Sequence, residues 1–214
     1  MVQIIPAVLA INEEEYLQYL TKLERCEALK NGWVHIDFLD GVFLPNKTIN
    51  AQESGKYPTT LQKEAHLMVQ NPKKWIPDLK KAGFKRVFFH MEASDDVESC
   101  INAIKDAGME AGLVLKHETS LETLDPFVLK IDAVLLMSVV PGFQGQPFIE
   151  EALDKVRQLK SKYPQIKVGV DGAVKNTNIK QIVDSGVDYV CVGSFLVKGD
   201  LDESMELLWE GINE

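Results

Sequence analysis

Cysteine is scarce in this chain of 214 residues, and its few cysteines stand far apart. Only Cys26, Cys100 and Cys191 occur, and no two of them form a Cys-X-X-Cys pair. An odd, widely spaced set excludes a disulfide scaffold and is typical of reduced thiols in the core of a protein from a reducing compartment. We therefore expect a cytoplasmic protein.

The sequence also lacks long apolar runs and long basic runs. No apolar run approaches the roughly 18 residues that a membrane span needs. The first residues, MVQIIPAVLAINEEE, have no cationic segment and soon turn acidic, so we expect no secretory signal peptide. With 23 Lys and Arg against 32 Asp and Glu, the formal net charge is −9. Because this charge repels nucleic acids and anionic membranes, the sequence predicts neither as a partner.

The composition is that of a globular protein. Hydrophobic residues make up 45% of the chain and charged residues 26%, which is enough to bury a substantial core and excludes intrinsic disorder. No linker rich in Pro, Gly or Ser divides the sequence. Residues 1–214 are therefore predicted to form a single domain.

Short β-branched or apolar runs alternate with amphipathic stretches of helical period. The predicted strands are 3–9, 33–38, 62–68, 86–90, 111–115, 133–137, 167–170 and 189–192. The predicted helices are 13–29, 73–82, 95–107, 149–160, 176–185 and 202–212. Strict alternation implies a parallel sheet with right-handed crossovers. Eight such units predict an α/β fold, a single (β/α)8 TIM barrel.

Two segments fit this alternation poorly. Residues 50–60 contain Gly55 and Pro58 and make a poor second helix, and the stretch between Ser120 and Pro126 is short for a helix. A doubly wound open sheet could use the same elements. That architecture remains the alternative at this level.

Four polar side chains stand at predicted strand ends, where a parallel barrel builds its active site. His35 and Asp37 are two residues apart in the second strand, so both face the same side of the sheet. His66 has inward parity in the third strand, and Asp171 ends the seventh. Two imidazoles and two carboxylates that face one another would bind one divalent ion, with Zn²⁺, Fe²⁺, Mn²⁺ and Co²⁺ all suited to this donor set.

Each of these residues also has a purely structural interpretation. A single histidine at a strand end commonly forms a hydrogen bond within the fold, and Asp171 before Gly172 could simply form a turn. Their coincidence on one face favours the metal site, and Asp37 among apolar neighbours needs a cation or a donor. We expect His90 to support the ligands or to lie in the core, and His117 to lie in a loop.

Glycine-containing loops follow the sixth, seventh and eighth predicted strands. In MSVVPGFQGQPF, Gly142 and Gly145 allow several backbone amides to converge ahead of a helix, whose positive end attracts an anion. Barrel enzymes often bind phosphate at the loops after strands seven and eight. Glycines three residues apart also suit an ordinary turn, but the combination predicts a phosphate site. Its expected backbone donors are Gly142, Gly145, Gly172, Ala173, Gly193 and Ser194.

Five sequence motifs occur in order along the chain. They are HIDFLDGVFLPN at 35–46, AHLMV at 65–69, MSVVPGFQGQPFI at 137–149, VDGAV at 170–174 and VGSFLV at 192–197. From Ile5 to about Val197 the sequence resembles the ribulose-phosphate 3-epimerase family. The resemblance implies a (β/α)8 barrel that interconverts D-ribulose 5-phosphate and D-xylulose 5-phosphate by proton transfer at C3, with one divalent metal per site. It also implies a homo-oligomer, either a dimer or a hexamer.

The resemblance assigns a role to each candidate residue. It implies that His35, Asp37, His66 and Asp171 ligate the metal. Asp37 and Asp171 are also implied to be the two acid/base groups. The substrate and phosphate contacts that it implies are His66, Gly142, Phe143, Gln144, Gly145, Gly172, Ala173, Gly193 and Ser194.

The periphery of the implied site departs from the family pattern, whereas the metal and acid/base positions do not. Met68 and the residue at position 39 would form apolar walls of the site. The departures are Ala7 for serine, Leu39 for methionine, Lys116-His117 for Asn-Pro, Val140 for asparagine, and Gln144 and Ala173 for glycines. They leave two alternatives open. One is a related ketose-phosphate 3-epimerase, acting for instance on D-allulose 6-phosphate, and the other is a barrel that binds a phosphosugar or a metal without turnover.

Overall fold

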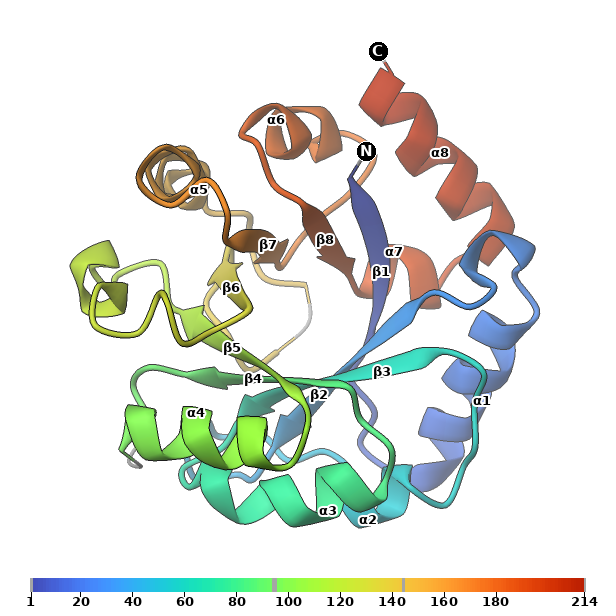
Figure 1. Cartoon of the computed structure of the whole chain (residues 1–214). Helices are drawn as coiled ribbons and strands as arrows, with labels where there is room; N and C mark the ends of the chain where they lie inside the picture. The colour runs from blue at the N-terminus through green and yellow to red at the C-terminus, as the bar shows by residue number, and fades with distance from the viewer. Residues whose placement is uncertain (1, 94–95, 144, 214) are drawn as a thin grey trace.

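The strands form a closed parallel barrel. The computed structural model describes residues 2–93, 96–143 and 145–213. Each strand pairs in parallel with the next, and β8 closes the barrel on β1 (Figure 1). This closure confirms the predicted TIM barrel and excludes the open sheet. The strands are β1 (Gln3–Val8), β2 (Trp33–Leu39), β3 (Gln62–Met68), β4 (Arg86–His90), β5 (Glu110–Leu115), β6 (Ala133–Met137), β7 (Lys167–Asp171) and β8 (Tyr189–Val192).

Helices cover the outside of the barrel, as Figure 1 shows. The α-helices are α1 (Glu13–Glu24), α2 (Ala51–Ser54), α3 (Ile76–Lys81), α4 (Val97–Asp106), α5 (Glu151–Lys162), α6 (Ile179–Asp184), α7 (Ser194–Val197) and α8 (Leu201–Asn213). Short 3₁₀ helices span Glu27–Leu29, Pro72–Trp75 and Leu121–Leu124. The crossover from β5 to β6 therefore has a 3₁₀ turn where the other crossovers have α-helix.

Two predicted helices are shorter than their sequence pattern. The helix predicted over 13–29 ends at Glu24, because the backbone at Cys26 is extended, with ψ at 112°, although the apolar pattern continues to Leu29. The helix predicted over 73–82 divides into a 3₁₀ turn and α3, and Pro77 stands at the start of α3 without an N–H to continue a longer helix. Residues 50–60 form only the single turn α2.

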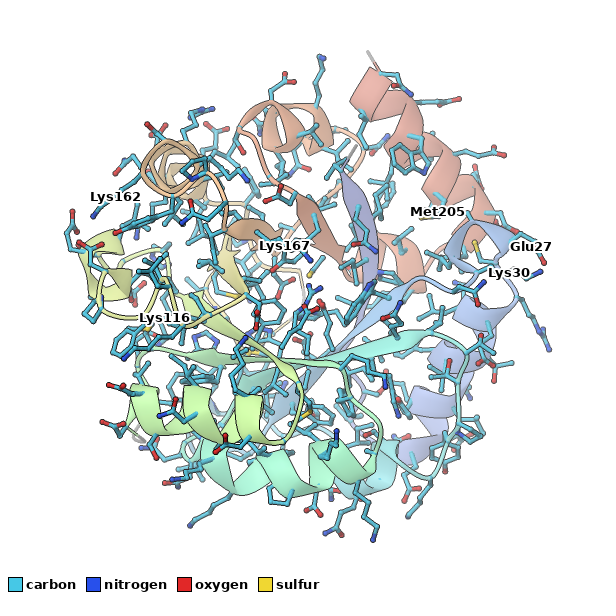
Figure 2. All side chains as sticks on the ribbon, viewed as in Figure 1. Glu27, Lys30, Lys116, Lys162, Lys167 and Met205 are labelled. Carbon is cyan, nitrogen blue, oxygen red and sulfur yellow. The ribbon has the colours of Figure 1, made fainter. Side chains whose placement is uncertain are left out.

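Charged side chains cover the outer surface. Figure 2 shows Glu27, Lys30 and Lys162 at the periphery of the molecule. Lys30 pairs with Glu27 at 3.4 Å, and Lys162 pairs with Asp125 at 2.7 Å. Across the ranges that the structure describes, none of the helices combines the length and the apolar character that crossing a bilayer requires.

Strand side chains alternate between two cores. Outward-facing residues such as Ile36 and Phe38 pack in the large core beneath the helices. Inward-facing residues such as Phe88, Leu135 and Tyr189 fill the barrel interior as a separate cluster. Because the interior is packed, a site can form only above it, at the ends of the strands.

Two glycines make room for aromatic rings inside the barrel. A Cβ atom at Gly112 would lie 2.2 Å from the ring of Phe88, and one at Gly169 would lie 2.1 Å from the ring of Tyr189. The Tyr189 hydroxyl donates a hydrogen bond to the carbonyl of Val134 at 3.3 Å. These rings therefore occupy the interior below the strand ends.

Candidate active site

Two imidazoles and two carboxylates converge at the C-terminal ends of β2, β3 and β7. Asp37 pairs in register with His66, and His35 precedes Asp37 by two residues on the same face of β2. Nδ1 of His66 lies 2.9 Å from Oδ1 of Asp37 and 3.5 Å from Oδ2 of Asp171. Nε2 of His35 lies 3.5 Å and 3.8 Å from the same two oxygens. One ligand atom from each of the four residues lies within 4.8 Å of the others.

The chemistry of this group fits a divalent ion. Both imidazoles are fully buried, and Asp37 and Asp171 are 8% and 9% exposed. Among the described residues, Nε2 of His35 has no hydrogen-bond partner although it is buried. A buried ring nitrogen that faces two carboxylates without a hydrogen bond is the environment of a metal ligand, and two nitrogen and two oxygen donors suit Zn²⁺ and similar ions. The four residues that the sequence predicted as ligands are thus brought together.

The protonation of these groups depends on their mutual contacts. Burial alone would raise the pKa of Asp37, but its close contacts with the His35 and His66 rings lower it below its ordinary value. Burial alone would lower the pKa of His66, but Asp171 and Asp37 raise it. The Asp37 carboxylate is therefore kept ionised, which is the form that binds a cation or accepts a proton.

A buried carboxylate and an arginine orient the His35 ring. Nδ1 of His35 lies 2.7 Å from Oε1 of Glu64, and Nη1 of Arg86 donates to Oε2 of Glu64 at 3.1 Å. Arg86 also donates to Glu110 at 2.8 Å and lies over the ring of Trp33 at 4.3 Å. Because an ionised carboxylate only accepts, Nδ1 carries the proton and Nε2 keeps its lone pair toward the aspartates. Glu64 is not among the residues predicted from the sequence, although it shares the inward parity of His66 two residues later.

Backbone hydrogen bonds fix the two aspartates at their strand ends. The Ser138 hydroxyl donates to the carbonyls of Asp171 at 3.1 Å and Gly172 at 2.7 Å. The Thr48 hydroxyl donates to the carbonyl of Asp37 at 3.1 Å. Each aspartate is therefore tied to a neighbouring loop at the point where its strand ends.

The two remaining histidines occupy different environments. His90 is fully buried, and its Nε2 lies 3.0 Å from Nε2 of His66. Burial lowers the pKa of His90 to about 4, although its contact with Glu92 acts in the opposite direction. Burial would raise the pKa of Glu92, but contacts with His90 and Thr119 lower it to about 2. His117 lies in the loop after β5, where its Nδ1 is 3.0 Å from Oε2 of Glu118.

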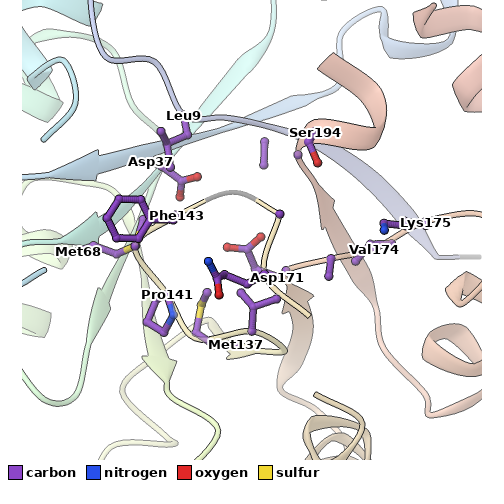
Figure 3. Close-up of a pocket in the computed structure, with 18 residues that line it drawn as sticks. Leu9, Asp37, Met68, Met137, Pro141, Phe143, Asp171, Val174, Lys175 and Ser194 are labelled. Carbon is purple, nitrogen blue, oxygen red and sulfur yellow. The ribbon is translucent and has the colours of Figure 1, made fainter. Parts of the chain in front are cut away.

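A pocket opens above the cluster at the C-terminal ends of the strands. Figure 3 shows the Asp37 and Asp171 carboxylates on two sides of the same gap, with Ser194 and Lys175 at one end and Met68 and Phe143 toward the other. Gln144 lies outside the described residues. Of the other predicted substrate and phosphate contacts, His66 is fully buried and is not part of the pocket lining. The rest line the pocket: Gly142, Phe143, Gly145, Gly172, Ala173, Gly193 and Ser194.

The turn after β7 has an unusual backbone. Gly172 has φ at 122°, and a Cβ atom there would lie 2.5 Å from Cγ2 of Val139. The next residue, Ala173, has φ at 51°, in the left-handed region that residues with a side chain disfavour. Glycine is therefore required at position 172, whereas Ala173 is strained.

The lining also includes residues that were not predicted from the sequence. Lys175 is exposed and follows Asp171 by four residues. Its short distance in sequence from the end of β7 is the feature from which it could have been predicted. Met68 lines the pocket as predicted. Leu39, predicted as a second wall, is buried and is not part of the lining, whereas Leu9, the residue after β1, lines the pocket. The other unpredicted lining residues are Met137, Val139, Pro141, Gln146 and Val174.

The protein is therefore a TIM barrel with a candidate metal centre. The two histidines and two aspartates lie beneath a pocket at the C-terminal ends of the strands, where barrel enzymes have their active site. The chain belongs to the ribulose-phosphate 3 epimerase family, whose sequence model matches residues 3–197. Ribulose-phosphate 3-epimerase from Serratia marcescens is 42% identical over 168 residues, which cover 75% of this chain and 80% of that protein. The cytoplasmic isoform of ribulose-phosphate 3-epimerase from Oryza sativa subsp. japonica is 35% identical over 198 residues, which cover 90% and 86%.

Solved structures of low sequence identity share the fold. The 3-hexulose-6-phosphate synthase from Salmonella typhimurium superposes with a TM-score of 0.70 at 16% identity, covering 99% of both chains. A mutant tryptophan synthase alpha-subunit from Pyrococcus furiosus superposes with a TM-score of 0.73 at 17% identity, covering 97% of this chain and 98% of that chain. At these identities the likeness concerns the barrel alone.

Proposed function

We propose that this protein is a metal-dependent epimerase that interconverts D-ribulose 5-phosphate and D-xylulose 5-phosphate by proton transfer at C3. The observation that carries the proposal is the grouping of two imidazoles and two carboxylates within 4.8 Å of one another beneath a pocket. Membership of the family supports it, since the relatives from Serratia and rice are both named ribulose-phosphate 3-epimerase.

The proposed cofactor is one divalent ion, either Zn²⁺, Fe²⁺, Mn²⁺ or Co²⁺. His35, Asp37, His66 and Asp171 would bind it. When bound, the ion supplies Lewis-acid stabilisation of the negative charge that develops on the substrate oxygens as C3 loses its proton. The content of metal in protein purified without chelator identifies the ion.

Asp37 and Asp171 are the proposed acid/base pair. Each carboxylate has a second oxygen besides the one in the ligand group, and the two carboxylates lie on different sides of the pocket (Figure 3). One carboxylate accepts the proton from C3, and the other donates a proton to the opposite face of the planar intermediate, which inverts C3. The reverse reaction exchanges the two roles. Apolar walls from Leu9, Met68 and Met137 exclude water from the intermediate.

Backbone amides are the proposed phosphate donors. The turns after β7 and β8 contribute Gly172, Ala173, Gly193 and Ser194 to the pocket lining, and Lys175 adds a positive charge at the end where Ser194 lies (Figure 3). Amide donors and a single lysine let a protein of net charge −9 bind a phosphate without a basic cluster. Gly142, Phe143 and Gly145 would approach the phosphate from the loop after β6.

The test is turnover by protein reconstituted with each of the four ions. We expect conversion of D-ribulose 5-phosphate to D-xylulose 5-phosphate and, in deuterated water, incorporation of deuterium at C3. Absence of conversion with all four ions would overturn the proposal. Binding of the phosphosugar without deuterium incorporation would instead identify a barrel that binds without turnover.

A six-carbon ketose phosphate such as D-allulose 6-phosphate is the second candidate substrate. The observation that favours it is Ala7, which lines the pocket and provides no hydroxyl where the family pattern has serine. Loss of one neutral hydrogen bond to a pentose would cost about 1 kcal/mol. A comparison of kcat/KM on the two phosphates separates the candidates, because a preference for the pentose removes the second one.

The proposed assembly is a homo-oligomer, either a dimer or a hexamer, in the cytoplasm. Family membership supports the assembly, and the three free cysteines support a reducing compartment. The net charge of −9 supports a small phosphorylated ketose as the partner rather than nucleic acid or a membrane. Light scattering of the purified protein measures the oligomeric state.

A further inference from the structure

His90 is a buried histidine that the proposed chemistry does not use. It is the last residue of β4, and its ring contacts those of His66 and Phe43, with centroids 5.1 Å away in both cases. Nε2 of His90 is 3.0 Å from Nε2 of His66, and its Nδ1 is 3.3 Å from Oε2 of Glu92. The side chains of His66, His90 and Glu92 therefore form a continuous chain from the candidate metal centre toward the rim of the barrel.

The contact between the two imidazoles is a hydrogen bond. The ring centroids are 5.1 Å apart and the Nε2 atoms are 3.0 Å apart, so the two rings approach each other through their Nε2 edges, with 27° between the ring planes. Two ring nitrogens at 3.0 Å need one proton between them, with one ring as donor and the other as acceptor.

The groups at both ends determine the direction of this hydrogen bond. Nδ1 of His66 faces Asp37 and Asp171, the side on which an ion would bind, so its lone pair is needed there. At the other end, the Glu92 carboxylate only accepts, so Nδ1 of His90 carries a proton and Nε2 of His90 is the acceptor. His66 therefore donates from Nε2.

We propose that His90 and Glu92 are positioning residues for the divalent ion: Glu92, acting through His90, keeps the proton of His66 on Nε2 and leaves Nδ1 free to bind. This inference rests on the metal centre of the proposed function. The side chains of Glu92 and His90 are themselves held in place, because the Thr119 hydroxyl donates to Glu92 and the Phe43 ring packs against His90. Glu64 supports the ring of His35 by a direct contact. Glu92 supports the ring of His66 in the same way, but through the ring of His90.

The first test measures the dissociation constant for Co²⁺ by competition with a chromophoric chelator, on the full chain without substrate. His90→Phe keeps a ring but removes both nitrogens, and Glu92→Ala removes the terminal acceptor. We expect each to weaken Co²⁺ binding by about 10- to 100-fold. Glu92→Gln should recover most of the affinity because its amide oxygen still accepts. His117→Phe is the matched control and should bind as the wild type does, because His117 contacts Glu118 in a loop.

The second test locates the proton itself. In the imidazole ¹H–¹⁵N spectrum of the Zn²⁺-loaded wild type, we expect His66 to carry its proton on Nε2. A proton on Nδ1, or wild-type Co²⁺ affinity in both His90→Phe and Glu92→Ala, would overturn the positioning role and leave the metal centre intact. A wild-type protein that binds no divalent ion would overturn the metal centre, and this inference with it.

Discussion

Nδ1 of His35 lies 2.7 Å from Oε1 of Glu64, and this contact directs Nε2 of the same ring toward the two aspartates of the candidate metal centre. Glu64 also pairs with Arg86 at 3.1 Å, and Arg86 pairs in turn with Glu110 at 2.8 Å. The side chain of Glu64 is fully buried, whereas that of Glu110 is 41% exposed. One arginine therefore has a buried partner and an exposed partner.

Glu64→Gln should destabilise the fold far more than Glu110→Gln. Removing the buried charge leaves Arg86 poorly compensated inside the barrel, which costs about 3–5 kcal/mol of the free energy of unfolding. The exposed pair contributes less than about 1 kcal/mol. Urea unfolding of the metal-free variants measures both values, and equal losses would contradict the assignment of Glu64 as the structural partner.

Asp37→Asn and Asp171→Asn should each abolish most proton exchange at C3 while the barrel stays folded. General acid/base catalysis contributes about 10²- to 10⁴-fold in rate, so a loss in this range is expected for either variant at saturating metal. Deuterium incorporation at C3 measures the exchange, and the exposed Asp184→Asn in α6 is the control that should keep full activity. Turnover close to normal in either active-site variant would refute the acid/base assignment.

Ser194→Ala should mainly raise KM. The residue lines the end of the pocket that is proposed to bind the phosphate. One hydrogen bond to a charged group is worth about 1.5–3 kcal/mol, which corresponds to at least about 10-fold in KM. Steady-state kinetics and the inhibition constant of inorganic phosphate should change together. Ser204→Ala in α8, outside the pocket, makes the same substitution and should change neither. A fall in kcat without a change in KM would argue against phosphate contact.

Removal of the metal should lower thermal stability. A ligand at 100 times its dissociation constant stabilises the folded state by about 2.7 kcal/mol, which for a chain of this size raises Tm by about 5–10 °C. Calorimetry before and after treatment with a chelator measures the shift. The Asp37→Asn variant, which lacks one ligand charge, should show a smaller shift, and an equal shift would place the stabilising ion elsewhere.

Ala173→Gly should raise the free energy of unfolding by about 0.5–1 kcal/mol. Ala173 has φ at 51°, and the strain of a left-handed alanine exceeds the entropy that glycine adds to the unfolded chain. Among the described residues the other non-glycine residue with positive φ is Asn31, at 58°, and asparagine tolerates this region. Asn31→Gly is therefore the control with a smaller gain. A loss of stability in Ala173→Gly would contradict the strain argument.

The strands could be predicted from the sequence more accurately than the helices. Strand residues are buried on both faces of a parallel barrel, so apolar runs such as 133–137 coincide with β6. Helix ends depend on local backbone geometry that periodicity does not report. Leu23, Cys26 and Leu29 are all buried and continue one apolar pattern, although the α-helix ends at Glu24.

The candidate ligands could also be predicted, because strand parity alone places His35 and Asp37 on one face. Their supporting residues were harder to identify. Glu64 lies within a strand, where a buried charge is unexpected until Arg86 is known to face it from β4. The role of Glu92 depends on the distance between two imidazoles of different strands, which no spacing along the chain encodes.

The rings of Phe88 and Tyr189, for which Gly112 and Gly169 leave room, fill the barrel interior beneath the site. The pocket is therefore closed below by the packed interior and opens only at the C-terminal ends of the strands. A substrate that enters the proposed site must leave through the same opening, so the next molecule can bind only after the product has left.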